Sequence, residues 1–168
     1  MKKKHQRFVK HTAWLGFGLY MIGLVYFLFI SEEMGRSGSV SSANLVPFQE
    51  INRSIWLLKH GIIYHKWSSI RYFILNFVLN IVAFMPFGFF LPIINHRQKH
   101  FFVLLISAAG FTAVIEMMQL LLGVGIFDVD DMILNLFGGI LGYFLYWLTR
   151  KTYIGVFFHK KKDGKKNG

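Results

Sequence analysis

The sequence contains no cysteine and only eight acidic residues, and these shortages exclude several kinds of site. Without cysteine there is no disulfide, no thiolate metal ligand and no cysteine nucleophile. A glycine-rich phosphate loop and a G-x-S-x-G motif are also absent, so the sequence predicts no cofactor. Only 16% of the 168 residues are charged, whereas 54% are hydrophobic and 18% aromatic. This composition is too apolar for a soluble domain.

Long apolar runs account for this composition. The expected membrane-spanning helices cover residues 12–30, 72–94, 101–122 and 132–148. The first three are long enough to cross about 30 Å of hydrocarbon at about 1.5 Å per residue. The fourth is shorter, but Asp130, Asp131 and Arg150 are placed to lie at its two interfaces. The sequence therefore predicts an all-α integral membrane protein with four transmembrane helices.

Basic residues are distributed unevenly around these runs. Of the 19 Lys and Arg residues, 14 lie in the N-terminal stretch 1–11, the loop 95–100 and the C-terminal stretch 149–168. The positive-inside rule then places both termini in the cytoplasm on either side of a membrane domain, 12–148. The net charge of +11 is thus interpreted as a topology signal that can touch anionic lipid, and no nucleic-acid partner is expected. The first run lacks a small-x-small cleavage pattern close behind it, which indicates an uncleaved anchor. From His159 onward the tail is expected to be disordered.

The segment 31–71 is the sizeable part expected outside the membrane. Its Ser- and Gly-rich first part, 31–44, is typical of a flexible loop. Further on, aliphatic residues recur at near-helical spacing among aromatic residues that favour the headgroup region. These residues are Ile51, Ile55, Leu58 and Ile62, with Trp56, Tyr64 and Trp67. The pattern predicts an amphipathic helix on the outer leaflet, with an irregular aromatic connection as the alternative.

Polar side chains within the apolar runs gather in the outer half of the bilayer. They are Asn76 and Asn80 in the second run, Glu116 and Gln119 in the third, and Asp128, Asp131 and Asn135 around the start of the fourth. At about 1.5 Å per residue, Asn80 and Glu116 lie roughly 12 and 9 Å below the outer ends of their helices. Ionisable groups at membrane depth usually face a protein interior or a water-filled cavity. We therefore predict an outward-facing polar pocket bordered by these seven residues.

Each of these residues also has a purely structural interpretation. The amides can act as interhelical hydrogen-bond donors and acceptors, worth about 0.6 kcal/mol each on average. An aspartate before a helix can cap its free N–H groups. A buried Glu116 needs a partner or a proton, and no Lys or Arg lies at its depth. If the protein is an enzyme, Glu116, Asp128 and Asp131 are the candidate acids, bases or metal ligands, although the metal motif is weak and no metal is predicted.

Glycine and proline within the runs are assigned to helix packing. Pro86 and Gly88 lie deep in the second run, where they can kink it or allow close contact. Gly138 and Gly142 form a small-xxx-small pair in the fourth, which is typical of a helix-packing surface. We expect this glycine face to be a candidate contact for a homo-oligomer, because four short helices make a thin wall around a cavity.

The order and spacing of these motifs resemble the VanZ family, membrane proteins named for teicoplanin resistance in Gram-positive bacteria. The motifs are Asn44-Leu45-Val46-Pro47-Phe48, Asn76-x-x-x-Asn80, Phe84-Met85-Pro86-Phe87-Gly88, Glu116-x-x-Gln119, and Asp128-x-x-Asp131-x-x-x-Asn135-x-x-Gly138 followed by Gly142. Relatives often carry an arginine just before the acidic cluster, whereas the turn 123–127 has no basic residue here. This difference argues against an anion-binding role for the turn.

The resemblance implies a multi-pass protein of a bacterial, Gram-positive cell membrane. The best-described member of the VanZ family lowers susceptibility to glycopeptides that bear lipid tails. Membrane lipid, a lipid-linked cell-wall precursor or such a glycopeptide are therefore the expected partners. Two function classes follow: a protein that recognises one of these molecules, and a membrane-embedded enzyme that modifies a lipid-linked envelope substrate.

Overall fold

The computed structural model describes residues 2–30 and 43–163, and almost all of them are helical. The elements are α1 (Lys2–Phe29), β1 (Ala43–Asn44), α2 (Gln49–Ile63), α3 (Trp67–Phe73), the π-helical turn η2 (Ile74–Val78), α4 (Leu79–Ile94), the 3-10 turn η3 (His96–Lys99), α5 (Phe101–Leu121), β2 (Phe127–Asp128) and α6 (Val129–Asp163). Among the described residues, four stretches are long and apolar enough to cross a membrane. They are Arg7–Phe29, Trp67–Ile94, Phe101–Leu121 and Val129–Lys151. The predicted all-α membrane fold is confirmed.

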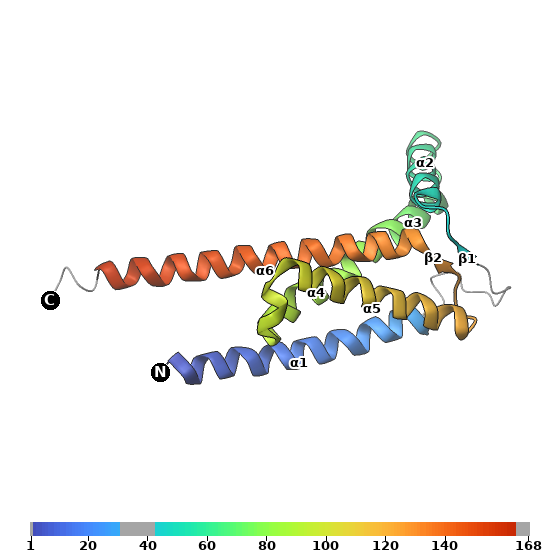
Figure 1. Cartoon of the computed structure of the whole chain (residues 1–168). Helices are drawn as coiled ribbons and strands as arrows, with labels where there is room; N and C mark the ends of the chain where they lie inside the picture. Colours follow the sequence, from blue (N-terminus) through green and yellow to red (C-terminus); the bar gives the residue numbers. More distant parts are fainter. Residues whose placement is uncertain (1, 31–42, 164–168) are drawn as a thin grey trace.

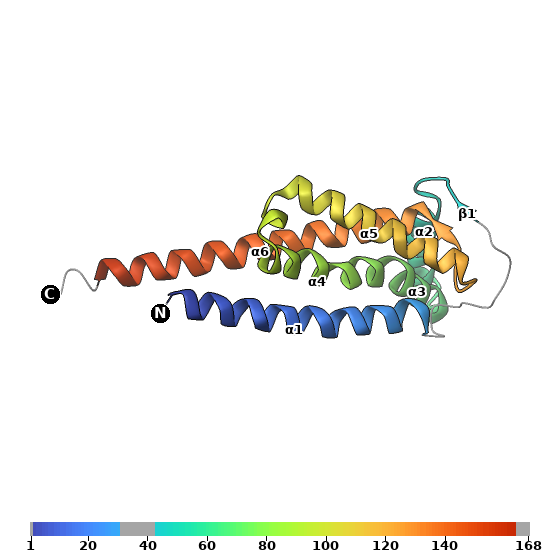
Figure 2. The ribbon, with the colours of Figure 1, turned by 60° about the horizontal axis from the view of Figure 1, so that its bottom comes forward.

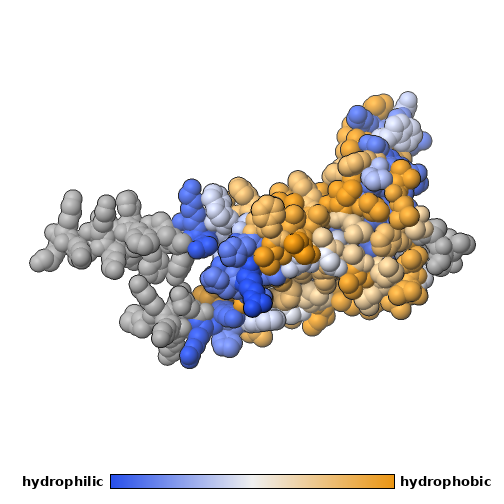
Figure 3. All heavy atoms as spheres, in the orientation of Figure 1, coloured by the Kyte–Doolittle hydropathy of each residue, from blue (hydrophilic) through white to orange (hydrophobic). Residues whose placement is uncertain are grey.

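The four spanning stretches alternate in direction, so both ends of the chain lie at the same end of the bundle (Figures 1 and 2). We call this the inner end, and the opposite end, which carries α2, α3, β1 and β2, the outer end. Hydrophilic side chains gather at the inner end and on α2, with a mostly hydrophobic surface between them (Figure 3). The placement of both termini in the cytoplasm stays a prediction.

Helix α4 occupies the middle of the bundle and packs on α6, α1 and α5. Its contact with α6, which we call the α4–α6 seam, is made by glycines whose missing side chains let the backbones touch. A Cβ atom on Gly88 would lie 1.9 Å from the carbonyl oxygen of Gly139, and one on Gly142 would lie 1.9 Å from that of Met85. Gly88, Gly138 and Gly142 therefore lie where the two backbones meet, as a packing role would require.

This seam also corrects one expectation. The face of Gly138 and Gly142 was the candidate contact for a homo-oligomer, but it is occupied within the chain by α4, since a Cβ on Gly138 would lie 2.1 Å from the Ile81 carbonyl oxygen. Small residues lower the interhelical distance wherever the partner helix lies, and here the partner is intramolecular.

Pro86 and Pro92 both lie inside α4, which continues through them as one helix.

Apolar side chains from α1, α4 and α5 form the core beside the seam. Leu24 and Leu28 of α1 are buried against Phe84 of α4 and Ile115 of α5. Further towards the inner end, the ring of Phe87 stacks on that of Phe111 at a centroid distance of 4.6 Å. The core thus ties three helices together through dispersion and hydrophobic burial.

The outer segment forms a helical hairpin, in which α2 leaves the bundle and α3 leads back into it (Figure 1). The amphipathic helix predicted from the isoleucine spacing is confirmed as α2, and its location at the membrane interface stays a prediction. The second spanning stretch begins at Trp67 rather than at the expected residue 72, because α3, η2 and α4 follow one another without a break. The flexible loop expected over 31–44 falls largely outside the described residues.

Two further features differ from expectation. Helix α6 continues to Asp163, so the disorder expected from His159 onward is wrong as far as Asp163. A short parallel pair joins β1 to β2, with Ala43 opposite Phe127 and Asn44 opposite Asp128. The sequence did not predict this pairing, which fastens the outer segment to the turn before α6.

Candidate functional site at the outer end

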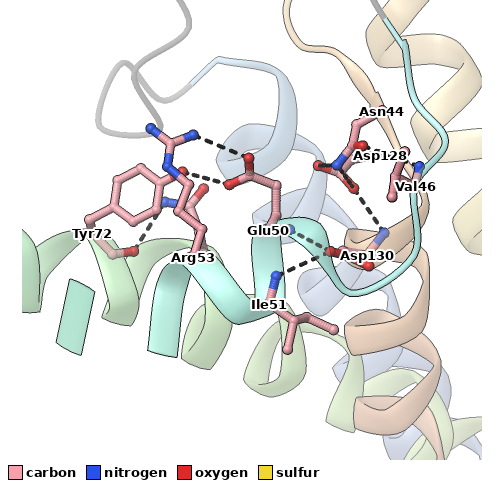
Figure 4. Close-up of polar contacts among 9 residues, drawn as sticks. Asn44, Val46, Glu50, Ile51, Arg53, Tyr72, Asp128 and Asp130 are labelled. Atoms are coloured by element: carbon pink, nitrogen blue, oxygen red, sulfur yellow. Dashed lines mark hydrogen bonds and ion pairs between the residues drawn. The ribbon is translucent and has the colours of Figure 1, made fainter. Parts of the chain in front are cut away.

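Three aspartates at the start of α6 hold three different parts of the structure together, and Figure 4 shows two of them, Asp128 and Asp130. The first, Asp128, is 4% exposed and accepts hydrogen bonds from Asn44 Nδ2 at 3.3 Å and from the backbone N–H of Asp130 at 2.8 Å. Its own backbone N–H donates to Glu116 Oε2 at 3.1 Å. Asp128 therefore connects β1, α5 and the start of α6. Burial raises the pKa of its carboxyl group.

The second aspartate, Asp130, caps α2 from a distance of about 80 residues in the chain. Its side-chain oxygens accept the backbone N–H groups of Phe48, Glu50 at 2.7 Å and Ile51 at 3.1 Å, and Asp130 is fully buried. Phe48, which precedes the helix, adopts a left-handed conformation with φ of 66°. A carboxylate at a helix N-terminus satisfies free N–H groups and complements the helix dipole. Asp130 thus fixes where α2 begins.

The third aspartate, Asp131, faces a ladder of amides on the second spanning stretch. Asn80 Nδ2 donates to Asp131 Oδ1 and to the Asn76 carbonyl oxygen, the latter at 3.0 Å. Asn76 Nδ2 in turn donates to the Tyr72 carbonyl oxygen at 3.0 Å. Asn76 lies within the π-helical turn η2, a distortion that is frequent at functional sites.

The remaining predicted site residues make interhelical contacts beneath this turn. Gln119 Nε2 donates to the Leu28 carbonyl oxygen at 3.1 Å, which joins α5 to α1. Asn135 Nδ2 donates to Thr112 Oγ1 at 2.9 Å, which joins α6 to α5. Both side chains are almost completely buried, at 6% and 2% exposure. Their contacts match the structural interpretation of interhelical hydrogen bonds.

A cavity of about 150 Å³ lies between the hairpin and the acidic turn. Of the seven predicted site residues, Asn76, Asp128 and Asp131 line it. Asn80 donates a hydrogen bond to Asp131, and Glu116 accepts one from the Asp128 backbone, but neither lines the cavity. Gln119 and Asn135 also lie outside the lining. The structure therefore brings five of the seven together at the outer end in two hydrogen-bonded sets, Asn76–Asn80–Asp131 and Asp128–Glu116, with three of the five at the cavity wall.

Sequence reasoning missed the contribution of the hairpin to this wall. Glu50 forms an ion pair with Arg53 at 3.1 Å and accepts a hydrogen bond from the Tyr72 hydroxyl at 3.0 Å (Figure 4). The Arg53 guanidinium also lies 5.3 Å from the centre of the Tyr72 ring. The hydrogen bond to Glu50 raises the pKa of Arg53, which stays charged. One signal was available in the sequence: Glu50 is one of only eight acidic residues and lies two positions after the Asn44–Phe48 motif.

The charges at the cavity are strongly unbalanced. Four carboxylates, those of Glu50, Asp128, Asp130 and Asp131, line it together with one guanidinium, that of Arg53. No group of three or more His, Asp or Glu side chains with the geometry to hold a metal ion occurs within residues 2–30 and 43–163. Backbone and side-chain amides already donate hydrogen bonds to several of the carboxylate oxygens. The remaining carboxylate oxygens can accept hydrogen bonds from a ligand.

Comparison with known proteins adds a family relationship. The model of the VanZ/LLP1 family matches residues 17–150. Protein VanZ of Enterococcus faecium is 36% identical over 76 residues, which cover 43% of this chain and 44% of that protein. The chain therefore aligns with less than half the length of this relative. No solved structure matches the chain.

Proposed function

The chain belongs to the VanZ/LLP1 family, and from this premise we propose that its outer cavity recognises a lipid-bearing molecule of the bacterial envelope. The candidates are an envelope lipid, a lipid-linked cell-wall precursor and a glycopeptide with a lipid tail. If the ligand is the glycopeptide, the expected phenotype is tolerance to teicoplanin-type drugs in a Gram-positive cell membrane.

The observation that carries this proposal is a polar cavity at the outer end of an otherwise apolar bundle. Its wall combines Glu50 and Arg53 of α2, Tyr72 of α3, Asn76 of η2 and Asp131 of α6. A polar cavity next to lipid requires water, a ligand or mutual pairing to offset the loss of hydration. Because the wall comes from four separate elements, a ligand there would contact both the hairpin and the spanning helices.

An enzyme is the competing class, with Glu116, Asp128 and Asp131 as acid, base or ligand. Recognition is supported by the way these carboxylates are held: Glu116 accepts the Asp128 N–H, Asp128 accepts Asn44, and Asp131 accepts Asn80. Fixed acceptors suit ligand positioning. Glu116→Gln separates the two classes, because the amide oxygen can still accept the Asp128 N–H but the side chain cannot ionise. Activity kept in Glu116→Gln and lost in Glu116→Leu supports recognition, and activity lost in both at normal protein level supports proton chemistry.

The direct test uses a susceptible Gram-positive host without a homologue. We expect the wild-type chain to raise the inhibitory concentration of teicoplanin but not that of a glycopeptide without a lipid tail. Asp131→Asn and Asn76→Ala should abolish the effect at unchanged protein level. Asn52→Ala, on the exposed part of α2, is the matched control and should behave like wild type. Tolerance kept in both cavity variants contradicts the proposal.

If the wild-type chain confers no tolerance, the glycopeptide is excluded as the ligand. The two lipid candidates are then tested by mass spectrometry of the lipids that co-purify with wild type and with Asp131→Asn. We expect one lipid species to be depleted in the variant. Identical lipids in both samples contradict the proposal.

A further inference from the structure

A second hollow, which we call the α1–α4 groove, lies between these two helices and is apolar. It measures about 320 Å³ and is lined by Gly23 and Phe27 of α1 and by Leu79, Val82 and Pro86 of α4, among others. Gly23 leaves the space open, because a Cβ atom there would have no neighbour within 4 Å. The one polar side chain beside the groove, Tyr20, directs its hydroxyl to the Ala83 carbonyl oxygen at 2.9 Å. The groove therefore offers apolar contact.

The groove and the outer cavity share one continuous helical stretch, Trp67–Ile94. Asn76 lines the cavity and Leu79, three residues further along, lines the groove. Three residues of helix correspond to a rise of about 4.5 Å, less than one turn. Moving from the outer end towards the middle of the bundle, the lining thus changes from carboxylates and amides to aliphatic and aromatic side chains. This order of polarity matches an amphiphile in the outer leaflet.

We propose that the α1–α4 groove holds the hydrocarbon chain of an amphiphile whose head occupies the outer cavity. The inference rests on the proposed function and makes it more specific. A volume of about 320 Å³ falls at the lower end of the roughly 300–1,000 Å³ typical of small-molecule sites. The two hollows share no lining residue, but their nearest lining residues, Asn76 and Leu79, lie within one turn of the same helical stretch.

The charges of the cavity define the head as a hydrogen-bond donor. The guanidinium of Arg53 pairs with Glu50 through one of its nitrogens and is the one cation among the residues that line the cavity. A phosphate or diphosphate would approach four acidic side chains and a single guanidinium, which is a poor match for its negative charge. A hydroxyl-rich or ammonium-bearing head would instead donate to Asp128 and Asp131. The ligand class is therefore an amphiphile with a neutral or cationic, donor-rich head.

The test uses two photoactivatable probes that share one alkyl chain with a diazirine group. One probe is a primary amine and the other is the corresponding fatty acid. The full chain is reconstituted in phosphatidylcholine vesicles, irradiated with each probe, and the labelled residues are located by mass spectrometry. We expect the amine to label the groove residues of α1 and α4 several-fold more than the acid does.

Two glycines of α1 provide a matched pair of variants. Gly23 lies in the groove and Gly18 lies outside it, and a Cβ atom at either position meets nothing within 4 Å. Gly23→Leu should fill the groove and lower labelling by the amine several-fold. Gly18→Leu adds the same side chain to the same helix and should leave labelling unchanged.

Two outcomes overturn the groove proposal. Equal labelling by both probes over all lipid-facing surfaces, unaffected by Gly23→Leu, means that only bulk lipid occupies the groove. Absence of labelling at the groove residues by either probe, with labelling on the other lipid-facing surfaces, means that a second copy of the chain covers the groove. These failures are distinguishable from failure of the proposed function. If Asp131→Asn abolishes the phenotype while Gly23→Leu and Gly18→Leu both keep it, the outer cavity stands and the groove does not. If Asp131→Asn has no effect, the proposed function itself fails.

Discussion

At the α4–α6 seam the two backbones touch with no side chain between them, whereas at the outer ends of the same spanning stretches carboxylates and amides line a cavity. The seam depends on the absence of side chains, since at Gly88, Gly138 and Gly142 there is no room even for a Cβ atom. The cavity is built from directed bonds, since Asp128, Asp130 and Asp131 each hold a different element. The seam therefore sets how closely α4 and α6 pack, and the outer end carries the polar groups of the proposed site.

The largest effect is expected from adding a methyl group to the seam. In Gly142→Ala the new Cβ would lie 1.9 Å from the Met85 carbonyl oxygen, so α4 and α6 must separate. Overpacking typically costs about 1–3 kcal/mol, and a backbone partner leaves little room to relax, so the cost should reach or exceed that range. Thermal unfolding of the purified protein measures it. The control Gly110→Ala meets nothing within 4 Å and should gain up to about 1 kcal/mol from helix propensity. Equal unfolding temperatures for the two variants would refute the account of the seam.

A smaller and more local effect is expected at the cap of α2. Asp130→Ala removes the acceptor for the N–H groups of Phe48, Glu50 and Ile51. Hydrogen bonds to a charged group contribute about 1.5–3 kcal/mol, and loss of a helix cap about 0.5–2 kcal/mol. Hydrogen exchange should therefore accelerate in the first turn of α2 and stay slow in α4 and α6. Acceleration spread evenly through the bundle would show that the outer end and the seam do not behave as separate regions.

The smallest effect on stability is expected at the one cation of the cavity. Arg53→Gln breaks the ion pair with Glu50. The Arg53 side chain is 58% exposed, and exposed ion pairs contribute about 0–1 kcal/mol to stability. The unfolding temperature should hardly change, while binding of the amine probe should become stronger because the wall becomes more negative. Lys59→Gln, on the same helix outside the cavity, is the control and should alter neither quantity. Weaker amine binding in Arg53→Gln would contradict the charge argument.

Much of the fold follows from the sequence because apolar length and charge asymmetry are local signals. Depth counting placed Asn80 and Glu116 roughly 12 and 9 Å below the outer ends of their helices, in the same outer half as the acidic turn. It did not predict which groups pair, and the structure joins Asn80 to Asp131 and Glu116 to the backbone of Asp128. The contribution of Glu50 to the wall could not be found this way. It depends on Asp130 capping a helix about 80 residues earlier in the chain, and no periodicity records such a contact.

Two other features also lay beyond sequence reasoning for physical reasons. The pairing of β1 with β2 spans only two residues in each strand, too short for an alternating pattern to appear. The sequence identified the glycine face of α6 as a packing surface, but small residues alone do not indicate which helix packs on them. That choice is made by the tertiary arrangement of α4.

The central claim, a polar cavity that opens at the outer surface, is tested most directly by cysteine labelling in a chain that has no cysteine of its own. Asn76→Cys places a thiol at the cavity wall, and His96→Cys places one in the exposed turn at the inner end. In intact cells a membrane-impermeant thiol reagent should label Asn76→Cys, and should label His96→Cys only after the membrane is opened. Labelling of Asn76→Cys only after opening the membrane, with His96→Cys labelled in intact cells, would contradict the account.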